Sequence, residues 1–454
     1  MKPVAEAGPV TTDSGGLYIE TFGCQMNVLD SELVEGLLER EGYRQVARPD
    51  LADLILYNTC SVRDHAEAKV RARLGGLRLL KRRRPEVVIG ILGCMAQREA
   101  DALLERWPHL DLVCGTRELH RVPELVGRIR RDRGRLLAAD IRAPVRLDAM
   151  PRPRVKGPLA YVSVVRGCDN VCSFCVVPRT RGREVSKPVD VVVAEVEALV
   201  GGGVKEVTLL GQNINSYGRG LAGEPDLAAL LAALDPIPGL ERVRFVTSNP
   251  WDMTERLLLA MGSLRTVCEY LHFPAQSGSD RILRSMRRDY TVRDYLGLVD
   301  RARELVPGIE LATDLIVGYP GEEEDDFQAT VRLMREVEFH TAYVFKYSVR
   351  PGTTAARLDD SVPDEAKRER NRILLEIQDG IALRKRKAKI GSIEEVLVEG
   401  PSKRDRSVLS GRTRQSYLAI FPPERAAPGD LLPIRITGCT ARTLRGAAEA
   451  AASG

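Results

Sequence analysis

Three cysteines fall within one short stretch, 166-RGCDNVCSFC-175, where Cys168, Cys172 and Cys175 are spaced C-x3-C-x2-C. Thiolates are soft ligands that suit zinc or iron-sulfur clusters. A structural zinc site takes four ligands, and no fourth cysteine or histidine lies nearby, since the next cysteine is Cys268. A 4Fe-4S cluster held by three cysteines leaves one iron open to a small molecule, and the sequence favours this interpretation.

Three more cysteines each follow a short apolar run, in LYIETFGC, DLILYNTC and VVIGILGC. A single cysteine after a strand usually packs in the core. Cys24, Cys60 and Cys94, however, are about one strand-helix unit apart, and the carboxyl ends of parallel strands meet at one edge of a sheet. We therefore expect these thiols to converge and to hold a second cluster, again with one open iron.

The elements that position these cysteines alternate strand and helix twice along the chain, which predicts an α/β fold. Residues 17–116 read as an N-terminal parallel α/β domain, and residues 120–158, rich in Arg and Pro, as a connection. Six further strand-helix units predict a partial (β/α)6 barrel with its active site at the carboxyl ends of the strands. A charged helix over 364–389 then leads to short strands with Gly, Pro and Asp turns, which predict a small C-terminal β-barrel.

Composition places limits on the function. The 454 residues suggest about three domains at roughly 150 residues each. No apolar run is long enough for a membrane span and no signal peptide is evident, so we expect a cytoplasmic protein without a membrane partner. In a reducing compartment the nine cysteines are more consistent with metal binding than with disulfides. Basic runs at 384-RKRKAK and 402-SKRDR favour a C-terminal region that binds a polyanion.

The cysteine loop, with Phe174 before its last cysteine, resembles the radical S-adenosylmethionine superfamily. Over residues 17–446 the chain is similar to the methylthiotransferases, and specifically to the bacterial branch that modifies isopentenyladenosine in tRNA. The matching segments include TFGCQMNVLDSE, NTCSVRDHAEAKV, RGCDNVCSFCVVPRTRGRE, LLGQNINSYG, TSNPWDM, QSGSDRILRSM, TDLIVGYPGE and GCTARTLRG. HFPAQSGS and Arg179 depart mildly from the family pattern.

The resemblance implies three domains: a cluster domain at 15–132, a radical SAM core at 150–383, and an RNA-binding TRAM β-barrel at 386–448. It implies methylthiolation of carbon 2 of the isopentenylated adenosine at position 37, next to the anticodon. One S-adenosylmethionine would methylate a sulfur on the auxiliary cluster, and a second would be cleaved at the other cluster to give the radical. The two open irons are expected to face each other if the N-terminal sheet edge caps the barrel mouth.

The implied partners are a tRNA anticodon stem-loop, a sulfur donor, and an electron donor such as a flavodoxin or ferredoxin, with a monomer as the default state. Polar or aromatic candidates for holding S-adenosylmethionine or the target base are Phe174, Gln212, Ser248 and Gln276; loop capping and cluster shielding are the alternatives. Candidates for phosphate contact in the β-barrel segment, otherwise plain surface charge, are Lys403, Arg404, Arg406, Arg412 and Arg414.

Three other functions compete with this one. Related methylthiotransferases act on threonylcarbamoyl-adenosine in tRNA or on a ribosomal protein, but 23-GCQMN-27 and NTCSVRDHAEAKV favour the isopentenyladenosine branch. A radical methylase without sulfur insertion is another possibility. A non-catalytic iron-sulfur protein that binds RNA would need no S-adenosylmethionine. The remaining cysteines, Cys114, Cys268 and Cys439, are interpreted as packing residues.

Overall fold

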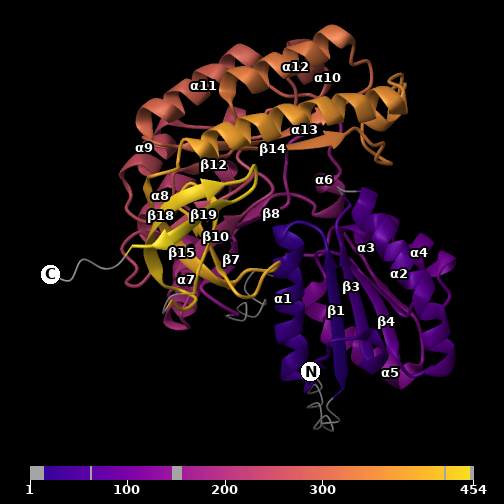
Figure 1. Ribbon diagram of the computed structural model, residues 1–454. Helices are drawn as coiled ribbons and strands as arrows, with labels where there is room; N and C mark the ends of the chain where they lie inside the picture. Colours follow the sequence, from indigo (N-terminus) through magenta and orange to yellow (C-terminus); the bar gives the residue numbers. More distant parts are fainter. Residues whose placement is uncertain (1–14, 62–63, 146–155, 424–425, 450–454) are drawn as a thin grey trace. The chain divides into compact units, whose positions relative to one another are not determined.

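The computed structural model describes residues 15–61, 64–145, 156–423 and 426–449 (Figure 1). The chain divides into two compact units. The N-terminal unit contains the described residues before 154 and a short later segment, Arg179–Gly182. The second unit contains Val155–Pro178 and Arg183–Gly454.

The N-terminal unit is a six-stranded sheet whose paired strands are all parallel, in the order β2-β1-β3-β4-β5-β6. Its strands are β1 (Gly16–Phe22), β2 (Arg44–Gln45), β3 (Leu54–Thr59), β4 (Val88–Gly93), β5 (Leu112–Cys114) and β6 (Leu136–Ala138). Its helices are α1 (Gln25–Arg40), α2 (Asp64–Arg83), α3 (Cys94–Glu99), α4 (Asp101–Arg106) and α5 (Val122–Asp132), with 3-10 turns at Pro49–Leu51 and Leu119–Arg121.

Both faces of this sheet are covered, which explains why β3 and β4 are apolar and buried at almost every position. Leu54 and Leu56 pack with α1 and α5, whereas Ile55 and Tyr57 pack with α2, α3 and α4 (Figure 1). The interpretation of residues 120–158 as a connection is wrong for its first part. Helix α5 is amphipathic and buries its apolar side, and β6 extends the sheet beyond residue 132.

The second unit begins with the six predicted parallel strands, which we call the partial barrel. They form two three-stranded sheets, β7-β10-β11 and β12-β13-β14, joined by a bridge between Val243 and Val267. The strands are β7 (Leu159–Ser163), β10 (Glu206–Leu210), β11 (Arg242–Phe245), β12 (Tyr270–His272), β13 (Glu310–Val317) and β14 (Thr341–Lys346). Two short strands, β8 (Val165–Arg166) and β9 (Val185–Ser186), pair beside the cysteine loop.

Helices pack around the partial barrel and bury one continuous apolar core. They are α7 (Val189–Gly201), α8 (Leu227–Leu234), α9 (Glu255–Ser263), α10 (Asp280–Ser285), α11 (Val292–Leu305) and α12 (Glu324–Val337), with 3-10 turns at Ile214–Ser216, Pro250–Asp252 and Ala355–Arg357. The short helix α6 (Val177–Thr180) follows the cysteine loop and contributes no residue to this core. The charged helix predicted at 364–389 is α13 (Asp364–Lys387), and it packs along β14.

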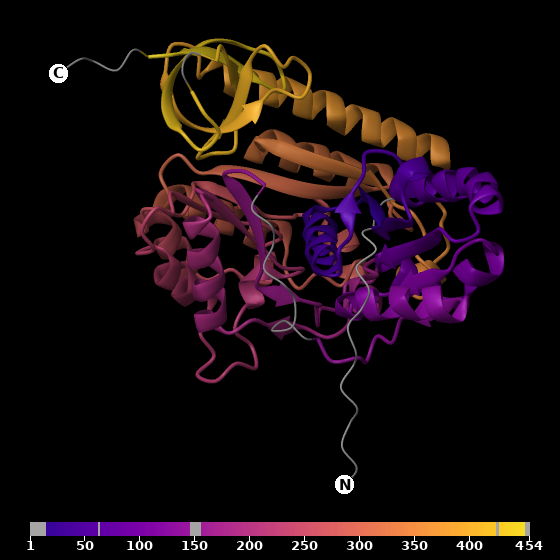
Figure 2. The same cartoon turned by 90° about the horizontal axis from the view of Figure 1, so that it is seen from below.

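The chain ends in a closed five-stranded barrel, which we call the C-terminal barrel and which appears as a ring in Figure 2. Its strands are β15 (Ile393–Pro401), β16 (Leu409–Thr413), β17 (Leu418–Phe421), β18 (Leu431–Cys439) and β19 (Leu444–Ala448). Closure leaves no unpaired strand edge exposed to another chain. No helix in the described ranges combines the length and apolar composition that a bilayer crossing requires.

Candidate functional site

The cysteines of the N-terminal unit follow three neighbouring strands of its sheet. Cys24 comes after β1 and precedes α1, Cys60 follows β3 directly, and Cys94 is the first residue of α3 after β4. The thiols interact with one another: a hydrogen bond with Cys60 lowers the pKa of Cys24 to about 6, and the charge of Cys24 adds to burial in raising the pKa of Cys94. The convergence predicted from the strand ends is therefore present in the structure.

Two buried asparagines support this thiol group. The Cys24 thiol donates to Oδ1 of Asn27 at 3.3 Å, and Nδ2 of Asn27 donates to Oδ1 of Asn58 at 3.0 Å. Nδ2 of Asn58 donates in turn to the carbonyl of Asn27 at 2.9 Å. Gly93 has φ +89°, and a Cβ there would lie 2.3 Å from Oδ1 of Asn58. A glycine is thus required immediately before Cys94.

The second cysteine group lies in the loop that follows β8 in the second unit. The loop is fixed by Gln212, whose Oε1 accepts from the backbone N–H of Gly167 at 2.6 Å. Burial raises the pKa of Cys168 to about 11 and that of Cys175 to about 12. Such thiols ionise near neutral pH only when a cation stabilises the thiolate, as a bound metal centre does.

The thiols are not arranged for a single metal ion. Among the described residues, no group of three or more His, Cys, Asp or Glu side chains lies close enough to hold one ion. A mononuclear zinc site would bring its sulfurs to about 2.3 Å from a common centre. A four-iron cluster instead spreads its three cysteine ligands over three different irons.

The predicted polar candidates at the barrel rim have different surroundings. The Ser248 hydroxyl is buried and has no hydrogen-bond partner in the described chain, as is also true of the Ser163 hydroxyl and Oδ1 of Asn213. Gln276 has φ +68°, and Thr247 has φ +71°, which is unusual for a β-branched residue. Strain of this kind clusters at functional sites, and the unpartnered polar atoms of Ser163, Asn213 and Ser248 could donate to or accept from a ligand.

Phe174 does not share these polar surroundings. Its ring packs against a small apolar cluster formed by Ile282, Met286, Tyr319, Tyr347 and Ala355. The sequence prediction left open whether Phe174 contacts the adenine of S-adenosylmethionine or shields the cluster. Its apolar packing favours shielding.

Arg288 is a residue of the cysteine loop environment that the sequence did not single out. Its Nη1 donates to the sulfur of Cys172 at 3.6 Å and to Oδ1 of Asn249 at 3.3 Å. The guanidinium is buried and lies over the rings of Trp251 and Tyr290. The guanidinium therefore lies next to the sulfur of Cys172. The only sequence signal was its place in 284-RSMRRDY-290, where it looks like surface charge.

The predicted phosphate-contact residues fall into two groups. Lys403, Arg404 and Arg406 are exposed on the loop between β15 and β16. Arg412, on β16 of the C-terminal barrel, pairs with Glu399 of β15 and is partly exposed. Arg414 points to the partial barrel instead of the solvent.

Arg414 binds Glu269 through two nitrogens at 2.8–3.0 Å and donates to the carbonyl of Val267 at 2.6 Å. Arg414 therefore attaches the C-terminal barrel to the partial barrel through Nε and Nη2. Its contact with RNA phosphate stays a prediction.

Two buried arginines complete this docking contact. Arg242, which begins β11, donates to the carbonyls of Arg412 and Glu395 at 2.6 and 3.1 Å. Arg244 donates to the carbonyls of Arg414 and Thr413 at 2.5 and 2.7 Å. The turn between β16 and β17 thus closes the amino-terminal end of the partial barrel, opposite the end where the cysteine loop lies.

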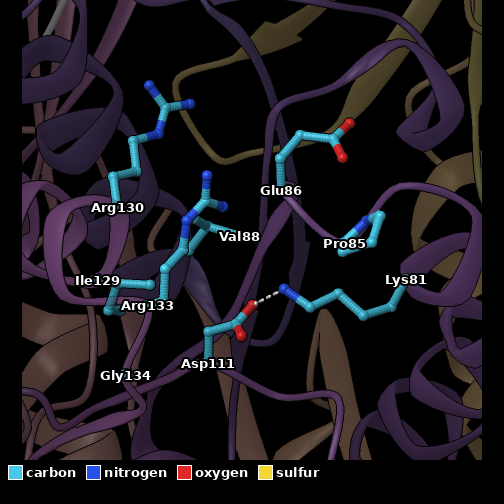
Figure 3. Close-up of a pocket in the computed structure, with 9 residues that line it drawn as sticks. All are labelled: Lys81, Pro85, Glu86, Val88, Asp111, Ile129, Arg130, Arg133 and Gly134. Carbon is cyan, nitrogen blue, oxygen red and sulfur yellow. Dashed lines mark hydrogen bonds and ion pairs between the residues drawn. The ribbon is translucent and has the colours of Figure 1, made fainter.

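A separate pocket of about 520 Å³ lies in the N-terminal unit, between the last turns of α2 and α5 and the start of β4 (Figure 3). Lys81, Arg130 and Arg133 line it, and Lys81 is paired with Asp111 at 2.7 Å. The pocket is at the amino-terminal edge of the sheet, whereas the cysteines follow the carboxyl ends. It is therefore separate from the thiol site.

Comparison with known proteins agrees with this division of the chain. Residues 16–115 match the uncharacterized protein family UPF0004, residues 162–334 the radical SAM superfamily, and residues 387–448 the TRAM domain. Among solved structures, the radical S-adenosylmethionine methyltransferase TsrM from Kitasatospora setae has a TM-score of 0.55 and 17% identity, covering 76% of this chain and 77% of that one. The radical enzyme OxsB has a TM-score of 0.53 and 12% identity, covering 81% and 56%. These likenesses show the fold.

The fold and the cysteine loop define a radical S-adenosylmethionine enzyme. A tRNA-2-methylthio-N(6)-dimethylallyladenosine synthase of Carboxydothermus hydrogenoformans is 45% identical over 422 residues, which is 92% of this chain and 96% of that protein. The protein of the same name in Moorella thermoacetica is 44% identical over 431 residues, 94% and 97% of the two chains.

The chain therefore belongs to the family of tRNA-2-methylthio-N(6)-dimethylallyladenosine synthases. This membership confirms the predicted enzyme class, a radical SAM tRNA methylthiotransferase, and its cofactors, S-adenosylmethionine and 4Fe-4S clusters.

Proposed function

We propose that this protein replaces the hydrogen at carbon 2 of N6-dimethylallyladenosine (isopentenyladenosine) at position 37 of tRNA with a methylthio group. Two molecules of S-adenosylmethionine are consumed, one as methyl donor and one as radical source. The observation that carries the proposal is the presence of two separate cysteine trios in a chain of this family, one after three parallel strands of the N-terminal sheet and one in the loop after β8.

The six cysteines are the proposed cluster ligands: Cys24, Cys60 and Cys94 for the auxiliary cluster, and Cys168, Cys172 and Cys175 for the other. When bound, the second cluster supplies the electron that cleaves S-adenosylmethionine, and the auxiliary cluster carries the sulfur to be transferred. Three cysteines per cluster would leave one iron of each open to a small molecule.

Other residues of the chain have supporting roles. Gln212 holds the cysteine loop through Gly167, and Arg288 donates a hydrogen bond to the sulfur of Cys172. The unpaired hydroxyl of Ser248 and the strained backbone at Gln276 offer hydrogen bonds to S-adenosylmethionine or to the target base. Such contacts would replace those that an extruded base loses when it leaves the anticodon-loop stack.

The exposed cations Lys403, Arg404 and Arg406 are the proposed contacts to tRNA phosphates. An external electron donor of the flavodoxin or ferredoxin class and a separate sulfur donor complete the reaction. All nine cysteines are free thiols, which is consistent with a proposed location in the reducing cytoplasm. We propose that the working form is a monomer.

Nucleoside mass spectrometry of tRNA from cells with and without the protein tests the reaction. We expect 2-methylthio-N6-dimethylallyladenosine to disappear and the unmethylthiolated nucleoside to accumulate. A variant with Cys24, Cys60 and Cys94 changed to Ala should still form 5′-deoxyadenosine from S-adenosylmethionine but insert no sulfur. Unchanged methylthio-adenosine in the deletion strain would contradict the proposal.

A further inference from the structure

The segment Arg179–Gly182 follows the second cysteine trio in sequence but belongs to the N-terminal unit. Oγ1 of Thr116 donates to the carbonyl of Thr180 at 2.5 Å, and Nε of Arg117 donates to the carbonyl of Arg181 at 3.2 Å. Gly182 has φ +77°, and a Cβ there would lie 2.4 Å from the Arg117 guanidinium. The segment is therefore attached to the domain that carries the auxiliary thiols.

This attachment buries the side chain of Arg181, which is only 4% exposed. Its Nη2 donates at 2.8 Å to Oδ2 of Asp30, a fully buried residue of α1. Its Nη1 makes no hydrogen bond to a nitrogen or oxygen of the described chain. A guanidinium carries five N–H donors, so Arg181 keeps donor capacity in a site from which water is largely excluded.

Besides Asp30, the thiols of Cys94 and Cys24 are the neighbours that act on the charge of Arg181. Although burial lowers the pKa of Arg181, Asp30, Cys94 and Cys24 together raise it above its ordinary value. A buried ion pair alone is weak evidence for stability, because desolvation offsets most of its Coulomb energy. A buried arginine that has an unused donor beside the thiols of Cys24 and Cys94 is better explained by an anion to which it donates a hydrogen bond.

We propose that Arg181 is a positioning residue that donates a hydrogen bond to an anionic sulfur of the auxiliary cluster site, with Asp30 holding its guanidinium in place. This inference rests on the proposed function, because it requires a cluster at Cys24, Cys60 and Cys94. Hydrogen bonds to the sulfurs of a cluster stabilise its reduced, more negative form and so raise its reduction potential. Arg181 thereby keeps the auxiliary cluster reducible and its transferable sulfur oriented.

The test measures the potential of the auxiliary cluster alone, in protein whose other three ligands, Cys168, Cys172 and Cys175, are changed to Ala. Reductive titration followed by electron paramagnetic resonance gives the potential, and iron analysis gives the cluster content. In Arg181→Met we expect the cluster to form and its potential to fall by at least about 59 mV, a tenfold change in the one-electron equilibrium constant. Arg181→Lys, which keeps the charge, should recover part of the shift.

Two further variants separate this role from a merely structural one. Arg117→Met loosens the same segment without touching a sulfur, so the potential should stay at the parent value. Asp30→Asn leaves the guanidinium charge less neutralised, so the potential should rise. The opposite signs expected for Arg181→Met and Asp30→Asn are not produced by general loosening of the fold.

The measured potentials and iron contents decide whether the proposed role of Arg181 or the proposed function fails. An unchanged potential in Arg181→Met, or an equal fall in Arg117→Met, overturns the inference. If Arg181→Met holds no iron, Asp30→Asn decides, and an unchanged or lower potential there overturns it. If the parent protein with only Cys24, Cys60 and Cys94 binds no cluster at all, the proposed function fails instead.

Discussion

Glu206 is the carboxylate on which the buried contact between the two barrels depends. Its Oε1 lies 2.7 Å from Nε of Arg244, and its Oε2 lies 3.9 Å from Nη1 of Arg242. All three side chains are at most 6% exposed. Removing one member of a buried ion pair typically costs about 3–5 kcal/mol, because the partner charge is left uncompensated. Glu206→Gln should therefore destabilise the second unit by roughly that amount.

The matched control is Glu399→Gln. Glu399 pairs with Arg412 within the C-terminal barrel, but that arginine is 40% exposed. Exposed pairs contribute about 0.2–1 kcal/mol, so Glu399→Gln should be nearly neutral. We expect the two Glu→Gln variants, which make the same chemical change, to differ by roughly 2–4 kcal/mol.

Native-state hydrogen exchange of the cluster-loaded protein measures this difference locally. In Glu206→Gln the backbone amides of β15, β16 and the turn to β17 should exchange faster, by about two to three powers of ten at 1.4 kcal/mol per tenfold change. The amides of the N-terminal unit should be unaffected. A loss below about 1 kcal/mol in Glu206→Gln, or an equal loss in Glu399→Gln, would refute the reasoning.

Three other results are expected. Burial, followed by nearby Arg386 and Lys385, lowers the pKa of His340 to about 3. As the pH falls, the unfolded chain therefore binds a proton at His340 before the folded chain does. The free energy of unfolding should consequently decrease by about 1.4 kcal/mol per pH unit below about pH 6.5. The variant His340→Gln should lose this slope in unfolding experiments at pH 5.5 and 7.5, and an equal slope would contradict the assignment. Neutralising the three cations of residues 403–406 should reduce the slope of log affinity for tRNA against log salt by about 2–3, whereas an unchanged slope would exclude phosphate contacts there. Arg288→Met should lower the iron bound by a protein that keeps only the second cysteine trio, and full loading would show that the arginine is dispensable for the cluster.

Much of the fold could be predicted because strand and helix periods are local properties of the sequence. The six strands of the partial barrel, the long helix α13 and the closing β-barrel all have clear patterns. The convergence of Cys24, Cys60 and Cys94 also follows from local information, since parallel strands bring their carboxyl ends to one edge. Helix α5 was missed because its many arginines hid the apolar side that it buries.

The long-range pairings could not be predicted in this way. Arg181 and Asp30 are 151 positions apart, and Arg414 and Glu269 are 145 apart. Nothing in the residues around Arg414 distinguishes it from Arg404, which stays exposed. Only tertiary structure decides which arginine pairs with a distant carboxylate, as Arg181 does with Asp30 and Arg414 does with Glu269.

The amino-terminal end of the partial barrel is joined to the C-terminal barrel through main-chain carbonyl oxygens. Arg242 and Arg244 reach the carbonyls of residues 412–414, and every amino acid carries such a carbonyl. This part of the attachment is therefore insensitive to which side chains the turn displays. A related protein could supply a foreign RNA-binding module at this joint and still seat it in the same orientation, provided that the two arginines remain and the turn keeps its length.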